Sequence, residues 1–369
     1  MNTGKRILLI GGGHAHVTAL RWLAKNPQDG LKLTLVNPGA RAAYSGMVPG
    51  VVAGHYDRHE AELDLGPLCA QTGVAFVNGR VTGFSPHGGF AELASRDSVE
   101  FDFASIDIGI TSGPEKAGDT NSILVKPMTG FLDEWERLKA TFQPGTSFPS
   151  IAIIGGGLGG VELALAVRHY ASQIAPGQAP GITIVDRAAR ILSESSRGLR
   201  TRMERELKRG GVAVRTQAEA TRHEGGILHL SDGTSLEADF VLWAAGARPQ
   251  DWLSQCRLAN KDGFPIVDAS LRSVSHPNIY VCGDVAHFQP HPLMKAGVYA
   301  VRQGPILMQN LVRAAKGDPQ IEYKPQTDYL KLVSLGRRKA VAEKWGLCVS
   351  LPGLWGQKRW IDCSFIQDA

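Results

Sequence analysis

The chain carries the same strand–glycine–helix–strand pattern twice, and this repeat constrains its fold more than any other feature. Residues 6–16 read RILLIGGGHAH and residues 150–160 read SIAIIGGGLGG, each an apolar run, a glycine cluster and the start of a helix-like stretch. A second apolar strand follows each helix, LKLTLVN at 31–37 and ITIVDR at 182–187. Because each unit is a complete βαβ crossover, the repeat predicts two separate nucleotide-binding domains of similar design.

The second glycine cluster fits the dinucleotide-binding pattern G-x-G-x-x-G through Gly155, Gly157 and Gly160. The first glycine permits the tight turn, the second lets the backbone approach a pyrophosphate, and the third packs the helix against the strand. Asp186 ends the next strand, where a carboxylate accepts from ribose hydroxyls and favours NADH. Arg187 beside it keeps NADPH open, so we expect an NAD(P)H site.

The first cluster is a poorer match. Gly11 and Gly13 keep the turn and the close approach, but His16 stands where the third glycine belongs and Asn37 takes the ribose-binding position. His14 and His16 are two residues apart, so they lie on different faces of a helix and we predict no metal site. Asn37 can still hydrogen-bond a hydroxyl, and the motif is completed by Gly283-Asp284, a strand end followed by a helix.

Composition excludes several classes of protein. The five cysteines, at 69, 256, 282, 348 and 363, form no C-x-x-C pair, which argues against a disulfide framework and a zinc site. The net charge of +5 is not gathered into a stripe, so no nucleic acid is expected. No apolar run suits a signal peptide or a membrane span. We predict a cytoplasmic protein, with peripheral contact on the inner face of the cell membrane left open.

Five segments together resemble one superfamily of flavoproteins. GGGHAH, IDIGITSG, IIGGGLGGVELA, LWAAGARP and IYVCGDVA occur in the order seen in the pyridine nucleotide-disulfide oxidoreductases, which have two dinucleotide-binding domains. YSGMVPGVVAGHY and KAGVYAVRQGPILMQNL resemble the type II NADH dehydrogenase-like branch, and within it the subset fused to selenophosphate synthetase. We therefore expect an α/β fold with two three-layer Rossmann-like domains, the second inserted in the first.

The expected boundaries follow the motifs. Residues 1–112 and 263–320 would form the FAD-binding domain, and 113–262 the NAD(P)H-binding domain. Residues 321–369 would form a small C-terminal region, β-rich and aromatic. Its Trp345, Trp355 and Trp360, with Lys358 and Arg359, suit a membrane surface, whereas a docked strand or a homodimer contact are the open alternatives.

The resemblance also implies roles for individual residues. FAD would lie against Gly11, Gly13 and Asn37 at its adenosine end and against Asp284 at its ribityl-pyrophosphate. The flavin ring would lie near two segments, Tyr44-Ser45-Gly46-Met47 and Lys295-Ala296-Gly297. The remaining residues assigned to cofactor binding are His14, Ala15, Gly113, Gly246 and Gly283.

Two residues are candidates for the chemistry. Glu162 either faces solvent at the start of its helix or lies where the nicotinamide meets the flavin. Lys126 either stabilises the reduced flavin or is a solvated surface lysine.

The resemblance implies an FAD-dependent NAD(P)H oxidoreductase with a quinone-like acceptor. Residues 1–68 contain no cysteine, so the redox-active pair of the disulfide reductases is missing. The glutamines that the quinone-reducing branch carries near its quinone are matched only by Gln303, beside Val298 and Arg302. A reductase for a ferredoxin-type or selenium-related protein partner, or a nucleotide-binding sensor or assembly protein of low turnover, are the alternatives.

Overall fold

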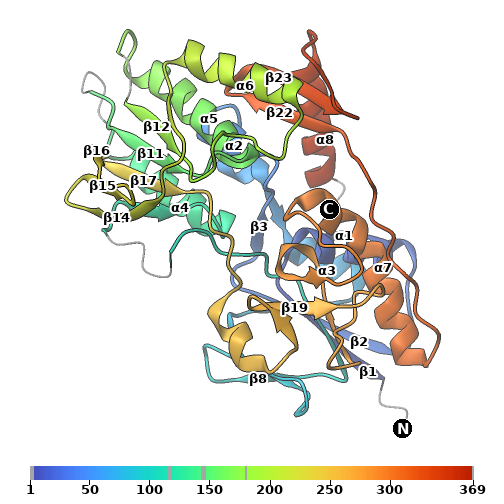
Figure 1. Ribbon diagram of the computed structural model, residues 1–369. Coiled ribbons are helices and arrows are strands. Elements are labelled where there is room, and N and C mark those ends of the chain that lie inside the picture. The colour runs from blue at the N-terminus through green and yellow to red at the C-terminus, as the bar shows by residue number, and fades with distance from the viewer. Residues whose placement is uncertain (1–3, 115–118, 143–146, 179–180, 368–369) are drawn as a thin grey trace.

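Two five-stranded parallel sheets organise the computed structural model, which describes residues 4–114, 119–142, 147–178 and 181–367 (Figure 1). The first sheet has the order β20-β9-β1-β2-β5. Its central strand β1 (Lys5–Ile10) ends at the first glycine cluster and pairs with β2 (Leu31–Asn37) and β9 (Phe103–Ile106). The edges are β5 (Ala75–Asn78) and β20 (Ile279–Val281), so the sheet is completed by a strand from far along the chain.

The second sheet repeats this arrangement with the order β10-β17-β11-β12-β13. Its central strand β11 (Ile151–Ile154) ends at the second glycine cluster, between β12 (Ile182–Val185) and β17 (Phe240–Trp243). The edges are β10 (Ser122–Leu124) and β13 (Ala213–Arg215). The predicted pair of parallel-sheet α/β units is confirmed.

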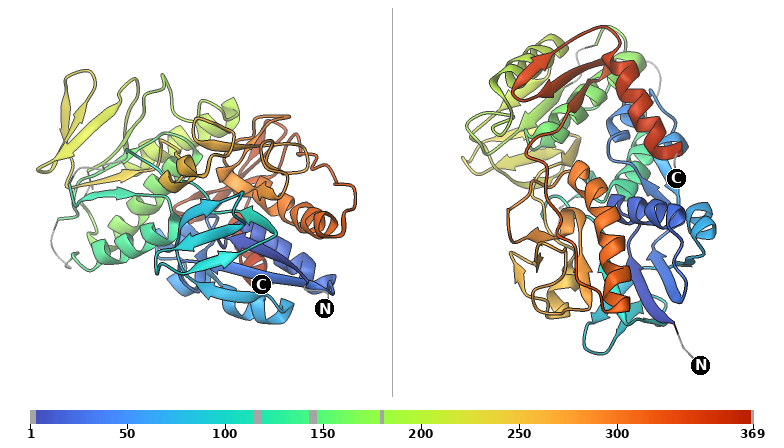
Figure 2. Two further views of the ribbon diagram at one scale, coloured as in Figure 1. Left: turned by 90° about the horizontal axis from the view of Figure 1, so that it is seen from below. Right: turned by 90° about the vertical axis from the view of Figure 1, so that its right-hand side faces the viewer.

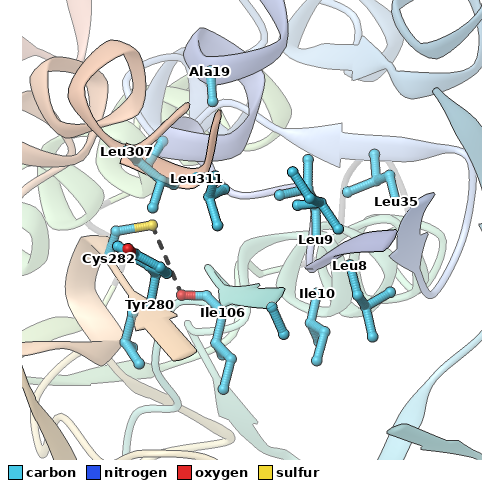
Figure 3. Packing of buried hydrophobic residues seen from close by; sticks show 14 of the residues in the cluster. Leu8, Leu9, Ile10, Ala19, Leu35, Ile106, Tyr280, Cys282, Leu307 and Leu311 are labelled. Carbon is cyan, nitrogen blue, oxygen red and sulfur yellow. Dashed lines mark hydrogen bonds between the residues drawn. The ribbon is translucent and has the colours of Figure 1, made fainter. Parts of the chain in front are cut away.

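Helices cover both sheets. Against the first lie α1 (His14–Lys25), α3 (Leu65–Thr72) and α7 (Gly297–Lys316). A Cβ added at Gly304 of α7 would lie 2.2 Å from the Ala15 carbonyl oxygen, so only glycine allows α7 this close to α1. Leu9 of β1 and Leu307 of α7 lie in the core between sheet and helices, whereas Leu8 points to the opposite face of the sheet (Figure 3). The second sheet carries α4 (Met128–Lys139), α5 (Leu158–Ile174) and α6 (Arg197–Gly210), with α2 (Val48–Val52) against α5.

Small sheets and short 3-10 helices fill the connections. The two-stranded sheet is β3 (Arg41–Ala43) with β4 (Glu62–Asp64). The three-stranded ones are β6 (Val81–Ser85), β7 (Phe90–Leu93) and β8 (Ser98–Glu100); β14 (Ala220–Glu224), β15 (Ile227–Leu230) and β16 (Ser235–Glu237); β18 (Asn260–Lys261), β19 (Phe264–Val267) and β21 (His287–Phe288). These sheets are antiparallel except for the parallel pair β19 and β21. The 3-10 helices are η1 (Arg58–Ala61), η2 (Asp251–Cys256) and η3 (Gly283–Val285).

The C-terminal region is a three-stranded sheet followed by a helix. β22 (Lys331–Leu335), β23 (Arg337–Lys344) and β24 (Leu347–Val349) are antiparallel, and α8 (Leu354–Gln367) follows them. The β-rich part was predicted, but the docked strand considered for the last segment is wrong because that segment is helical. This red segment runs over the second domain and returns toward the blue N-terminal one (Figure 2). Among the described residues, no helix has the length and apolarity needed to cross a membrane.

Candidate dinucleotide-binding site

One cavity of about 1970 Å³ reaches both glycine loops at the carboxyl ends of the two central strands. A single small-molecule pocket usually measures up to about 1000 Å³, so this cavity has room for more than one large ligand. Most of the predicted residues line it: Gly11, Gly13, His14, Asn37, Tyr44, Ser45, Gly46, Lys126, Gly155, Gly157, Gly160, Glu162, Asp186, Arg187, Asp284, Lys295, Ala296 and Gly297. Five do not: Ala15, Met47, Gly113, Gly246 and Gly283.

The second loop has the geometry its sequence predicts. Gly155 has φ +117°, and a Cβ on Gly160 would lie 2.0 Å from the Gly155 carbonyl oxygen, so the third glycine is required by close packing. The Asp186 carboxylate accepts hydrogen bonds from the backbone N–H of Gly156 and, at 2.7 Å, of Ala188. Among the described residues, no acceptor outside α5 binds the N–H groups of its first turn, which suits an anionic ligand.

The first loop is held in the same way at its start. The Gly12 N–H donates to Oδ1 of Asn37 at 2.8 Å, as Gly156 donates to Asp186. Asn37 uses its other atom too, because its Nδ2 donates to the Gly39 carbonyl at 2.8 Å. Asn37 therefore orders the glycine loop as well as lining the cavity.

His16 closes the first loop in place of the third glycine. The side chain is completely buried, and its Nδ1 lies 2.6 Å from the Gly11 carbonyl oxygen while Nε2 lies 2.8 Å from the Ser105 hydroxyl. Burial lowers the pKa of His16 to about 4, so the ring is neutral. Because a carbonyl only accepts, Nδ1 carries the proton and Nε2 accepts from Ser105. The imidazole makes the helix–strand contact that Gly160 makes by backbone packing.

Asp107, which follows β9, is a residue that the sequence analysis missed. Its Oδ2 accepts from the N–H groups of Ala15 at 2.8 Å and His16 at 3.0 Å, in the first turn of α1. The residue is 2% exposed, and burial raises its pKa to about 7. A Cβ on Gly13 or Gly283 would collide with this carboxylate. Ala15 and Gly283 therefore contact Asp107 instead of the cavity. The signal was present, since IDIGITSG has an acid where LWAAGARP has Ala244.

Two lysines surround Asp284. Lys126 donates to the Asp284 carboxylate at 3.0 Å, and its side chain is 26% exposed, so it is a partly exposed, ion-paired lysine in the cavity wall. Lys295 donates to the Ala286 carbonyl at 2.8 Å, and burial lowers its pKa to about 8. The Gly283 N–H donates to Oε1 of Gln303 at 2.7 Å. Gln303 is thus occupied in holding the Gly-Asp turn.

Comparison with known proteins identifies the family. Residues 5–304 match the family described as pyridine nucleotide-disulphide oxidoreductase. The chain belongs to this family. It is 24% identical over 93% of its length to a type II NADH:quinone oxidoreductase of Staphylococcus saprophyticus, covering 90% of that protein. It is 27% identical over 79% of its length to the ferredoxin–NAD(+) reductase component of a biphenyl dioxygenase system of Paraburkholderia xenovorans, covering 69% of it.

A solved structure shares the fold. The sulfide:quinone oxidoreductase of Aquifex aeolicus superposes with a TM-score of 0.81 over 99% of this chain and 92% of that one, at 15% identity. The pyridine nucleotide-disulphide oxidoreductase family comprises NAD(P)H-dependent flavoproteins that use FAD. The cavity fits both cofactors, because it exposes two glycine loops, each followed by a helix start and faced by a polar strand end.

The disulphide in the family's name has no counterpart in this cavity. All five cysteines are described and free, and none lines the cavity. Cys282 is next to Gly283, but it is buried and its Sγ points to the Ile106 carbonyl, 3.8 Å away (Figure 3). Burial raises the pKa of its thiol well above the usual value, which makes it a poor nucleophile.

The C-terminal helix α8 contributes to the cavity wall, which the sequence did not reveal. The buried Lys358 donates to the Gly46 carbonyl at 2.8 Å and to Asp362 at 2.7 Å. Phe365 stacks on Tyr44 with ring centres 4.5 Å apart and lies 5.8 Å from the His14 ring. The loop predicted to lie near the flavin is therefore packed under α8.

Glu162 belongs to the same wall. Its Oε1 accepts from the Ser334 N–H of β22 at 2.7 Å, so the solvent-facing alternative for Glu162 is wrong. Burial raises the pKa of Glu162, while the nearby Lys358 opposes that rise. The other two predicted positions, Gly113 and Gly246, pack against each other where the chain crosses between the sheets, and the Gly113 N–H donates to the Ala245 carbonyl at 2.7 Å.

Proposed function

We propose that this chain is an FAD-dependent NAD(P)H oxidoreductase that delivers electrons to a quinone-like acceptor without a redox-active cysteine pair. The observation that carries the proposal is the single cavity that joins both glycine loops and contains no cysteine. Two cofactors bound to the two loops would share this space. The similarity to a type II NADH:quinone oxidoreductase supports a quinone as the acceptor.

Each cofactor has a set of residues to hold it. Gly11, Gly13, Asn37 and Asp284 would bind FAD, with the loops at 44–47 and 295–297 beside its ring system. When bound, FAD supplies the ability to accept a hydride and to release the electrons to another acceptor. The first turn of α5 and the Asp186 carboxylate would orient NAD(P)H from the other side of the cavity.

Glu162 would hold a proton for the acceptor. Reduction of a quinone to a quinol takes two electrons and two protons, so an acid beside the acceptor assists it. The Glu162 carboxyl lies in the cavity wall with a raised pKa, and Lys358 and Asp362 of α8 act on it electrostatically. Lys126 would place positive charge near Asp284, on the FAD side.

The test is anaerobic reduction of the purified full-length protein. We expect a yellow protein whose flavin absorbance bleaches with NADH or NADPH and returns when a soluble ubiquinone analogue is added. The Glu162→Gln variant should bleach at the unchanged rate but recolour about tenfold more slowly. One hydrogen of the quinol arrives with the hydride, and the proton that an acid supplies is needed only when the quinone is reduced. A flavin that stays oxidised with both nucleotides would refute the proposal.

A protein acceptor is the second candidate, favoured by the similarity to a ferredoxin–NAD(+) reductase component. The same reduced protein would then be reoxidised by a ferredoxin and not by the quinone. A selenium-handling protein, the other partner that the sequence resemblance implies, would be tested in the same way. NAD(P)H turnover that is stimulated by ferredoxin and not by the quinone would assign this second function.

The tail supports contact with a membrane surface. Trp345 is 75% exposed and Leu347 70% exposed on the β23–β24 hairpin, and Trp360 of α8 is 70% exposed. Aromatic side chains beside lysine and arginine suit an anionic lipid interface. Sedimentation with vesicles containing phosphatidylglycerol should carry the protein down, and Trp345→Ser with Trp360→Ser should abolish this. A homodimer in solution that buries both tryptophans would favour the dimer alternative.

A further inference from the structure

The first turn of α1 is occupied by a carboxylate of the protein itself. Asp107 receives the N–H groups of Ala15 and His16, and its other oxygen faces Gly13 and Gly283. These backbone groups form the end of a helix that favours anions in nucleotide-binding domains. A pyrophosphate at this loop would therefore approach an acid that already holds the helix donors.

The second domain shows what this position looks like without the acid. Ile10 pairs with Ile106 and Ile154 pairs with Trp243, so Asp107 and Ala244 occupy equivalent places one residue beyond their strands. Ala244 leaves the first turn of α5 with no acceptor from the rest of the described chain. At this position the two loops thus differ by one buried carboxylate beside the phosphate-binding turn.

We propose that FAD binds to the first loop only with Asp107 protonated, so that its binding takes up a proton and weakens as the pH rises from 6 to 8. This rests on FAD occupying the first glycine loop, as proposed above. Two negative charges on the pyrophosphate would repel an ionised Asp107, and burial of that carboxylate leaves little water to screen the repulsion. A neutral carboxyl still accepts from Ala15 and His16, so it keeps α1 in place without that repulsion.

Of the other ionisable groups around Asp107, the two histidines keep the same charge throughout this window. His16 and His14 on α1 have pKa values of about 4 and stay neutral. The pKa of the Cys282 thiol, next to η3, is raised well above its usual value. Asp284 of η3 is paired with Lys126. Lys295 has a pKa of about 8, so it begins to lose its charge within this window and is about half neutral at pH 8. Asp107 itself, with a pKa of about 7, titrates in the middle.

The experiment measures the Kd of the full-length apoprotein for FAD by quenching of flavin fluorescence. A group with pKa near 7 that must be neutral in the complex weakens binding about tenfold between pH 6 and pH 8. Calorimetry at pH 7.5 in two buffers of different ionisation enthalpy should then report uptake of about 0.8 proton per FAD. The Asp107→Asn variant keeps the acceptor for Ala15 and His16, and we expect it to lose the tenfold change in Kd and the proton uptake. Only the smaller change caused by Lys295 near pH 8 should remain.

NADH provides an internal control, because Ala244 stands at the equivalent place in its domain. Its Kd should change less than about twofold over the same range in both proteins. A Kd for FAD that does not depend on pH in the wild type, or the same slope in Asp107→Asn, would overturn the inference. Should the variant fold poorly, the proton uptake of the wild type decides alone. Absence of FAD binding at every pH would refute the proposed function instead.

Discussion

The two glycine loops of this protein share their strand order and register but are closed by different chemistry. In the second domain Gly160 packs directly on the Gly155 carbonyl near Ala244, and Leu242 occupies the strand position next to it. In the first domain the equivalent positions are His16, Ser105 and Asp107, a buried polar network. The comparison teaches that the third glycine of the G-x-G-x-x-G pattern is one way to pack the helix start against the carbonyl of the first glycine. A neutral imidazole that donates to the same carbonyl is another.

Replacing Gly160 by alanine should have the largest effect, because the second loop has no space for a side chain. The added Cβ would lie 2.0 Å from the Gly155 carbonyl oxygen, a backbone atom that cannot rotate away. We expect a loss of about 3 kcal/mol in the free energy of unfolding and an NADH affinity about a hundredfold lower. Denaturation and NADH titration measure both. FAD affinity serves as the control, and an NADH affinity within threefold of wild type would contradict the close-packing argument.

Replacing His16 by alanine tests the hydrogen-bonded contact that holds the first glycine loop. The change removes the bonds to the Gly11 carbonyl and the Ser105 hydroxyl inside a completely buried site. Two buried polar groups without partners and a cavity should cost about 2 to 3 kcal/mol of unfolding free energy. Urea denaturation measures it, with the exposed His291→Ala as the matched control. Equal stabilities of the two variants would show that the network is dispensable.

Asp107 should make the stability of the apoprotein depend on pH. Its pKa is raised from 3.8 to about 7, so the folded state binds a proton more tightly than the unfolded state does. The contribution of Asp107 to the free energy of unfolding is largest below pH 4, declines as the pH rises to 7, and is constant above that pH. Asp107→Asn lacks this decline and should be about 2 kcal/mol more stable than wild type at pH 8. Unfolding at pH 4.5 and pH 8 checks it; a difference between variants that does not grow with pH would contradict the assignment.

The sequence predicted what depends on local pattern and missed what depends on contacts between distant segments. Each βαβ unit is visible because its strands, glycines and helix are consecutive, so the sheets and most cavity residues could be assigned. Asp107 was overlooked because its partners are the backbone of α1, about 90 residues away in the chain. Its mismatch with Ala244 in the repeat was the available clue.

The wall formed by α8 is the second omission. Lys358 and Asp362 are four residues apart, a spacing typical of a solvated pair on a helix surface. Burial of that pair against the Gly46 carbonyl is decided by the packing of α8 on a loop from the other end of the chain. No periodicity in residues 354–367 reveals it.

The polar residues at the ends of β2 and β12 should give the smallest effects, and exchanging them sharpens the comparison. Asp186 accepts from both Gly156 and Ala188, and Asp186→Asn keeps only one acceptor oxygen, so NADH affinity should fall about tenfold. Asn37 accepts from Gly12 but donates to Gly39, and Asn37→Asp would place a carboxylate against that carbonyl. The gain at a ribose and the loss at Gly39 oppose each other, so FAD affinity should change less than about threefold. Titration of each variant with both cofactors measures four affinities. If Asn37→Asp improved FAD binding tenfold or more, the asparagine would be weakening FAD binding in the wild-type protein. An unchanged affinity would mean that the hydrogen bond from its amide to the Gly39 carbonyl compensates for the missing carboxylate.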